Sequence, residues 1–172
     1  MTPAHAVFSV DEHRERLWRA RAALAAEGFD LCVSVAPETH YYLAGYDSWV
    51  GVNSPQALVF STREDDDPVL LVRNVDIPLA RETTWLGNVR SYHLHAEDVA
   101  ARIRDIVAEK AVAPRHIAMD LQSYALSARL FQQLCDALAP AAIGDGTGVL
   151  GTLRIIKSAA EMAEIVKASE YT

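Results

Sequence analysis

The stretch Gly28-Phe29-Asp30-Leu31-Cys32-Val33-Ser34-Val35 decides the fold, because a glycine suited to ending a helix is followed by a short, nearly all-apolar run. A strand that is apolar at almost every position is typical of a sheet covered on both faces. Residues 31–35 therefore predict a buried strand between two layers of helices.

A helix is expected immediately before this strand. Ser9-Val10-Asp11-Glu12 has the S-x-x-E pattern of a capping box, and Gly28 supplies the C-terminal stop. The apolar face is predicted to consist of Leu17, Ala20, Leu24 and Ala25, with Arg14, Glu15, Arg19 and Arg21 largely elsewhere.

Strand and helix patterns alternate along the rest of the chain. The expected strands are 56–60, 69–72, 89–92, 116–120 and 141–143. The expected helices are 77–85, 97–111 and 123–138, and residues 38–45 are expected to form a short helix or a turn. The first two strands flank Glu64-Asp65-Asp66-Asp67-Pro68, which predicts a solvated hairpin turn. The pattern predicts an α/β fold, a three-layer sandwich around a mixed sheet of five or six strands.

Composition excludes several classes of partner. The 172 residues carry 16 basic and 23 acidic side chains, and the net charge of −7 disfavours nucleic acid and anionic lipid. No run of 18 apolar residues predicts a membrane span, and the first ten residues lack the pattern of a secretory signal. Cys32 and Cys135 lie in apolar settings without a C-x-x-C pair, which is typical of buried thiols in a reducing cytoplasm.

Three motifs could carry chemistry, and none has the context it needs. Residues 146–151 match G-x-G-x-x-G, but they follow the last strand and are better interpreted as a glycine-rich linker than as a dinucleotide site. His93 and His95 would project from one face of a strand near Glu97 and Asp98, which leaves a small zinc enzyme as a weak alternative. Ser48 does not lie in a G-x-S-x-G elbow.

An aromatic loop is the stronger candidate for function. Hydrogen-bonding side chains gather in and just before residues 46–55, namely His40, Tyr41, Tyr42, Tyr46, Asp47, Trp49 and Asn53. Such a loop can line a pocket or an interface, although part of its ring area is expected to close one end of the sheet.

Four segments carry a resemblance to a known family. Arg16-Leu17, Gly28-Phe29-Asp30-Leu31, Tyr41-Tyr42-Leu43-Ala44-Gly45-Tyr46 and Leu153-Arg154-Ile155-Ile156-Lys157-Ser158-Ala159-Ala160-Glu161-Met162 resemble the amino-terminal domain of the creatinase/prolidase (Xaa-Pro aminopeptidase) family. The resemblance covers nearly the whole chain. It implies a non-catalytic α/β domain of a hydrolase that cleaves a C–N bond in a dipeptide or small amide.

The same resemblance implies where metals and substrate bind. In this family a larger, following domain holds two divalent metals (Mn, Co or Zn) with two aspartates, a histidine and two glutamates, so no catalytic residue, metal ligand or cofactor is expected in this chain. The amino-terminal domain supplies homodimer contacts and a wall of the neighbouring active site. The implied substrate-contacting residues are Tyr46, Asp47, Trp49 and Asn53.

The resemblance also bears on the substrate. Creatine-hydrolysing members carry a phenylalanine and an arginine where this chain has Gly51 and Asn53, which argues against creatine. Residues 45–49 are closer to the ectoine-hydrolase-like branch, which opens small cyclic or amide substrates.

The last stretch of the chain predicts a change of domain. Residues 1–152 are expected to form the amino-terminal domain, and residues 153–172 the hinge and the start of a catalytic domain's first helix. Ser158 and Glu161 form a second capping box before an amphipathic helix that needs a partner. A stand-alone ligand-binding or dimerisation module of the same fold is the alternative.

Overall fold

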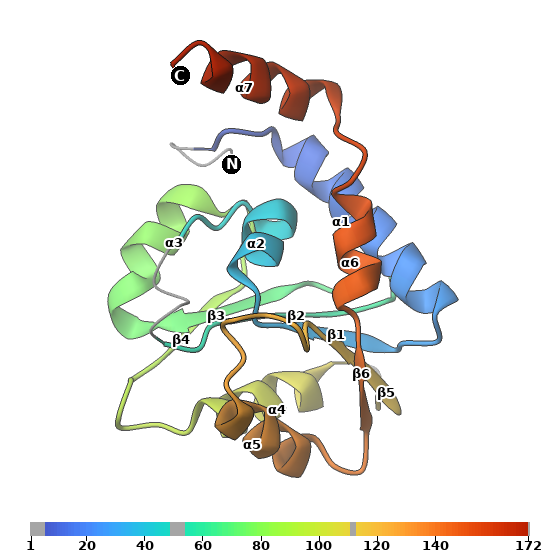
Figure 1. The fold of residues 1–172 in the computed structure, drawn as a ribbon. Coiled ribbons are helices and arrows are strands. Elements are labelled where there is room, and N and C mark those ends of the chain that lie inside the picture. Colours follow the sequence, from blue (N-terminus) through green and yellow to red (C-terminus); the bar gives the residue numbers. More distant parts are fainter. Residues whose placement is uncertain (1–5, 49–53, 111–112, 172) are drawn as a thin grey trace.

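The computed structural model, which describes residues 6–48, 54–110 and 113–171, is a three-layer α/β sandwich, as predicted (Figure 1). Its described residues form one mixed six-stranded sheet in the order β4-β3-β2-β1-β5-β6. The strands are β1 (Leu31–Ser34), β2 (Ala57–Ser61), β3 (Val69–Arg73), β4 (Val89–Tyr92), β5 (His116–Met119) and β6 (Ala142–Asp145).

β1 occupies the centre of the sheet, and all four of its residues are buried. It pairs with β2 in the antiparallel direction and with β5 in parallel, so Leu31 faces Ser61 on one side and Ile117 on the other. β2 and β3 form the predicted antiparallel hairpin, whereas the β3–β4 and β5–β6 pairs are parallel.

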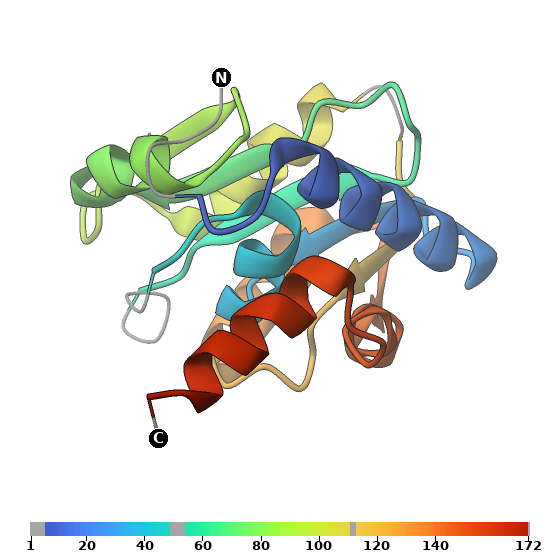
Figure 2. The same cartoon turned by 90° about the horizontal axis from the view of Figure 1, so that it is seen from above.

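Helices cover both faces of the sheet (Figures 1 and 2). One layer consists of α1 (Val10–Ala26), α2 (Pro37–Thr39), the π-helical η1 (His40–Ala44), α3 (Ile77–Thr83) and α6 (Thr147–Leu153). The other consists of α4 (Val99–Glu109) and α5 (Ala128–Leu138). Each layer encloses its own cluster of buried apolar side chains against the sheet.

α1 begins and ends at the predicted residues. The Ser9 side chain accepts a hydrogen bond from the Glu12 amide, and Gly28 adopts a left-handed φ of 81° just past the helix. The predicted face is wrong at two positions, because Ala25 is exposed and Arg21 is buried. Arg21 lies inside because its guanidinium finds backbone acceptors there.

The acidic turn is less solvated than predicted, because two basic side chains reach it. Arg21 donates hydrogen bonds to the carbonyls of Ser61, Glu64 and Asp66. Lys110 donates to the Asp66 carboxylate at 3.1 Å, and the side chains of Lys110 and Asp66 are largely buried. The turn is therefore anchored to α1 and to the residue after α4.

Three further expectations need correction. The glycine-rich stretch forms most of α6 instead of a linker, because Leu150 packs into the core. α5 begins at Ala128 rather than 123, where the Ser127 side chain caps its first turn. Cys32 is fully buried, which raises the pKa of its thiol, whereas Cys135 is only half-buried.

α7 (Ala159–Ser169) lies beyond the helical layer, next to the amino-terminal end of α1 (Figure 1). It begins with the predicted capping box of Ser158 and Glu161. Met162, Ile165 and Val166 are about half exposed, with 47, 48 and 54% of their surfaces accessible. The domain boundary after residue 152 stays a prediction. None of the helices in the described ranges is long and apolar enough to cross a membrane.

Candidate functional site

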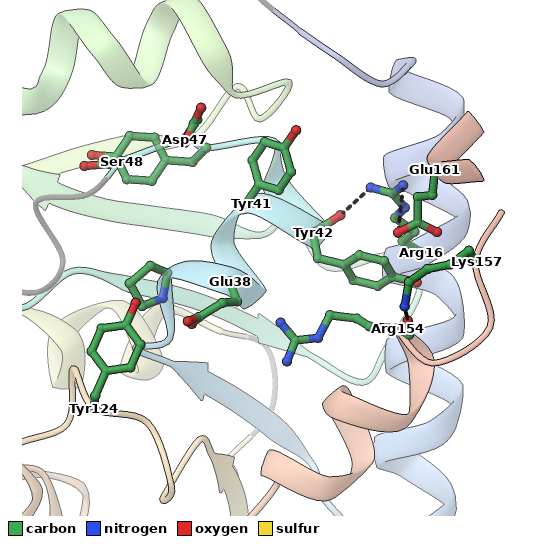
Figure 3. A pocket seen from close by; sticks show the side chains of 12 residues that line it. Arg16, Glu38, Tyr41, Tyr42, Asp47, Ser48, Tyr124, Arg154, Lys157 and Glu161 are labelled. Atoms are coloured by element: carbon green, nitrogen blue, oxygen red, sulfur yellow. Dashed lines mark hydrogen bonds and ion pairs between the residues drawn. The ribbon is translucent and has the colours of Figure 1, made fainter. Parts of the chain in front are cut away.

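A cavity of about 510 Å³ opens between η1, the chain that leaves it, and the segment joining α6 to α7 (Figure 3). Tyrosines and charged groups of both signs dominate its wall. They are Tyr41, Tyr42, Tyr46, Tyr124, Arg16, Glu38, Asp47, Arg154, Lys157 and Glu161. Such a wall can bind a small polar molecule through hydrogen bonds and ion pairs.

Gly45 forms the turn that places Tyr46 and Asp47, the first two predicted site residues. It ends η1 with a left-handed φ of 71°, and an added Cβ would lie 3.0 Å from His13 Nε2 and 3.1 Å from the Thr83 carbonyl oxygen. The turn sends Tyr46 into the core, where it is 1% exposed, and leaves Asp47 exposed at the cavity. Trp49 and Asn53, like Gly51, lie outside the described residues.

Arg16 forms the charged base of the cavity and is 1% exposed. Its Nη2 lies 3.1 Å from Glu12 Oε1 and 3.6 Å from Glu161 Oε1, and its Nη1 donates a 3.3 Å hydrogen bond to the Tyr42 carbonyl. The guanidinium also lies over the rings of Phe8 and Tyr42, at 4.2 and 4.6 Å from their centroids. One cation thus joins α1, η1 and α7.

The sequence interpretation missed this role of Arg16. The sequence does contain a signal for this role. Arg16 lies one helical turn after Glu12 and one turn before Ala20, so the three side chains share one face of the helix. A charge on the apolar face of a helix indicates either a buried partner or a site.

The cavity tyrosines are neutral hydrogen-bonding groups at physiological pH. Burial is the main cause that raises the pKa of Tyr41, Tyr42 and Tyr46. The Tyr42 hydroxyl donates to the Leu153 carbonyl at 3.0 Å and so ties η1 to the end of α6.

The two candidate zinc histidines do not project from a strand, so the placement assumed in the weak zinc alternative is wrong. β4 ends at Tyr92, and both His93 and His95 are exposed in the turn that follows, with His95 at a left-handed φ of 69°. The His93 amide donates to the Glu97 carboxylate at 2.6 Å, which builds the turn before α4. Within residues 6–48, 54–110 and 113–171, no group of three or more His, Cys, Asp or Glu side chains could hold a metal ion.

Solved structures share this architecture. The N-terminal domain of an Xaa-Pro dipeptidase from Lactobacillus brevis aligns over 79% of this chain and 98% of its own, with a TM-score of 0.68 and 24% identity. An Xaa-Pro dipeptidase from Bacillus anthracis aligns over 88% of this chain and 38% of its own, with a TM-score of 0.71 and 15% identity. At these identities the likeness establishes the fold.

Comparisons of sequence add the family. The chain is 27% identical over 172 residues to an uncharacterized hydrolase/peptidase of Sinorhizobium fredii, and 27% identical over 163 residues to the ectoine hydrolase of Halomonas elongata. These alignments include 96% and 90% of this chain but only 43% and 40% of the length of the two relatives. Residues 16–156 match the model of the creatinase/prolidase N-terminal domain. The chain therefore belongs to the creatinase/prolidase family and constitutes its N-terminal domain.

Proposed function

We propose that this chain is the non-catalytic N-terminal domain of a cytoplasmic, homodimeric metallohydrolase that cleaves a C–N bond in a dipeptide or small amide. Its loop 46–55 restricts the substrate and forms a wall of the neighbouring subunit's active site. In this proposal the catalytic metals belong to a separate domain, as the family resemblance implies.

One observation carries the proposal: the chain leaves η1 at the rim of the cavity with Asp47 exposed. The buried Tyr46 fixes the start of the loop, and the Tyr92 hydroxyl fixes its end through a 2.6 Å hydrogen bond to the Pro55 carbonyl. Fixed anchor points at Tyr46 and Pro55 support a role in substrate selection, because such loops act from a rigid scaffold.

The relatives supply the reaction class. Their names are a hydrolase/peptidase and an ectoine hydrolase, and the structural neighbours include Xaa-Pro dipeptidases. Ectoine and a series of Xaa-Pro dipeptides are therefore the first substrates to assay with the full-length protein.

The test compares Asp47→Asn and Trp49→Ala in that full-length enzyme. Each is expected to raise KM about tenfold, the loss typical of one charge-assisted hydrogen bond or one aromatic contact, with kcat and bound metal unchanged. Asp65→Asn, an exposed acid in the hairpin turn, is the matched control and keeps the original KM. Unchanged kinetics in both loop variants would overturn the assignment of the loop.

The dimer is tested separately by sedimentation equilibrium of the full-length protein. The mass of two chains is expected at micromolar concentration. A monomer with full activity would contradict a wall supplied by the neighbouring subunit.

A further inference from the structure

A smaller cavity lies at the point in the sheet where the connections that follow two neighbouring strands run to opposite faces. The chain leaves β1 toward α2 and η1 on one face, and it leaves the adjacent parallel β5 toward α5 on the other. Neighbouring parallel strands whose connections diverge leave a crevice at their carboxyl ends, which is where α/β sheets bind ligands. Here the crevice holds about 170 Å³, with Thr39, Asp120 and Arg154 in its wall.

Asp120 lies at the floor of this crevice and is 3% exposed. Its carboxylate accepts hydrogen bonds from the Ser34 hydroxyl and, at 3.3 Å, from the Thr39 hydroxyl. Both donors are neutral, although a carboxylate can accept about four hydrogen bonds. Among the described residues no cation forms an ion pair with Asp120.

The buried imidazole of His40 does not supply the missing charge. His40 is buried, its Nε2 lies 3.0 Å from the Ser34 carbonyl oxygen, and burial lowers its pKa so that the ring is neutral. A buried carboxylate is costly unless a positive group or further donors reach it. The floor of the crevice is therefore suited to a cationic, hydrogen-bond-donating ligand.

Arg154 provides the opposite charge on the same wall. Its guanidinium points into the open space and faces the Glu38 carboxylate across it (Figure 3). No ion pair joins these two groups, and within the described ranges the guanidinium has no carboxylate partner. A planar guanidinium without a partner matches a carboxylate in a bidentate manner.

We propose that the β1–β5 crevice binds a small zwitterion, a free α-amino acid, with its ammonium group toward Asp120 and Glu38 and its carboxylate on Arg154. The size of the crevice restricts the ligand to a short side chain. The crevice shares Glu38 and Arg154 with the larger cavity, but it uses no residue of loop 46–55, and its test does not depend on the proposed hydrolase function.

The experiment uses the 172-residue chain, labelled with ¹⁵N and titrated at pH 7 while its amide resonances are recorded. The ligands are L-alanine, propionate, which lacks the ammonium group, and ethylamine, which lacks the carboxylate. L-Alanine is expected to bind with a Kd of about 1 mM and to shift amides around Ser34, Asp120 and Arg154. Each half-ligand is expected to bind about tenfold more weakly, because it loses one charge-assisted contact.

Two variants separate the two ends of the ligand. Asp120→Asn keeps the shape of the side chain and is expected to weaken L-alanine and ethylamine about tenfold while leaving propionate unchanged. Arg154→Gln is expected to weaken L-alanine and propionate but not ethylamine. Arg81→Gln, an exposed change on α3, is the matched control and leaves all three affinities unchanged.

Two results would overturn the site. The first is the absence of shifts around the crevice at about 50 mM L-alanine in the folded chain, a concentration far above the expected Kd. The second is equal affinity for L-alanine and its two halves. If Asp120→Asn unfolds the chain, the partly exposed Arg154→Gln alone decides, because an unchanged affinity for propionate contradicts the proposal.

Discussion

The two helical layers differ in what they bury. α4 and α5 cover their face of the sheet with apolar side chains, such as Ile103 and Leu134, which are both fully buried. The opposite layer also buries His13, Arg16 and His40. The cavity of Figure 3 opens on that polar side, next to η1.

The difference shows that the two layers stabilise the domain by different kinds of contact. Apolar contacts are non-directional and reward buried area, so the α4/α5 layer needs only shape and volume. Buried charges need particular partners at particular distances, and these partners fix how α1, η1 and α7 lie relative to one another.

The largest effect is expected in the apolar layer. Leu134→Ala removes a side chain with 0% exposure and leaves a cavity between α5 and the sheet. The free energy of unfolding should fall by about 3 kcal/mol in urea denaturation. Leu79→Ala on α3, where the side chain is 39% exposed, should cost clearly less. Equal losses for both variants would mean that the α4/α5 layer contributes no more than the surface does.

A smaller loss with a local readout is expected in the polar layer. Arg16→Met keeps much of the side-chain volume but removes the cation from Glu12 and Glu161. Because these carboxylates retain some exposure, we expect a loss of about 2 kcal/mol, less than for a fully buried broken pair. Hydrogen exchange in α7 should accelerate more than exchange in α5.

The matched control lies on the same helix. Arg14→Met makes the same substitution in an exposed pair, where the side chains of Arg14 and Asp11 are 64 and 92% exposed. Such pairs contribute little, so stability and α7 exchange should stay unchanged. Uniform acceleration of exchange across the domain in Arg16→Met would show that Arg16 does not specifically hold α7.

Buried strands and local helix caps are the features that the sequence predicts best. The run at 31–35 correctly indicates a buried strand, because burial on both faces requires apolar residues at successive positions, and the run at 116–120 correctly indicates a strand. Caps at Ser9 and Ser158 are equally legible, since their hydrogen bonds reach only three residues along the chain.

The polar layer escapes such interpretation because its partners are distant in sequence. Arg21 lies 40 residues from the Ser61 carbonyl that it contacts, and Asp120 lies 86 residues from Ser34. No local pattern encodes these pairs. Of the predicted site residues, Tyr46 and Asp47 lie at the cavity, whereas the crevice at Asp120 emerges only once β1 and β5 are seen to be neighbours.

The smallest expected effect is a dependence of the free energy of unfolding on pH, caused by buried histidines in the polar layer. Burial is the largest cause that lowers the pKa of His13 and of His40 from 6.5, and nearby hydrogen bonds and carboxylates partly oppose it. Below that value the unfolded chain binds protons that the folded chain does not. The free energy of unfolding should therefore be fully retained above about pH 7 and fall as the pH drops toward about 5.

Two variants test whether the buried histidines cause this change in the free energy of unfolding with pH, that is, its slope. His13→Gln should flatten it, because one of the two buried rings no longer titrates, whereas the doubly substituted His93→Gln/His95→Gln chain changes only exposed rings and should keep it. The lowered pKa of Asp30, caused by backbone hydrogen bonds from His116 and Arg115, acts below its ordinary value of 3.8 and so outside this range. Urea midpoints measured across the range give the slope directly. If it is unchanged in His13→Gln and lost in the exposed double variant, the acid sensitivity belongs to the surface and not to the buried polar layer.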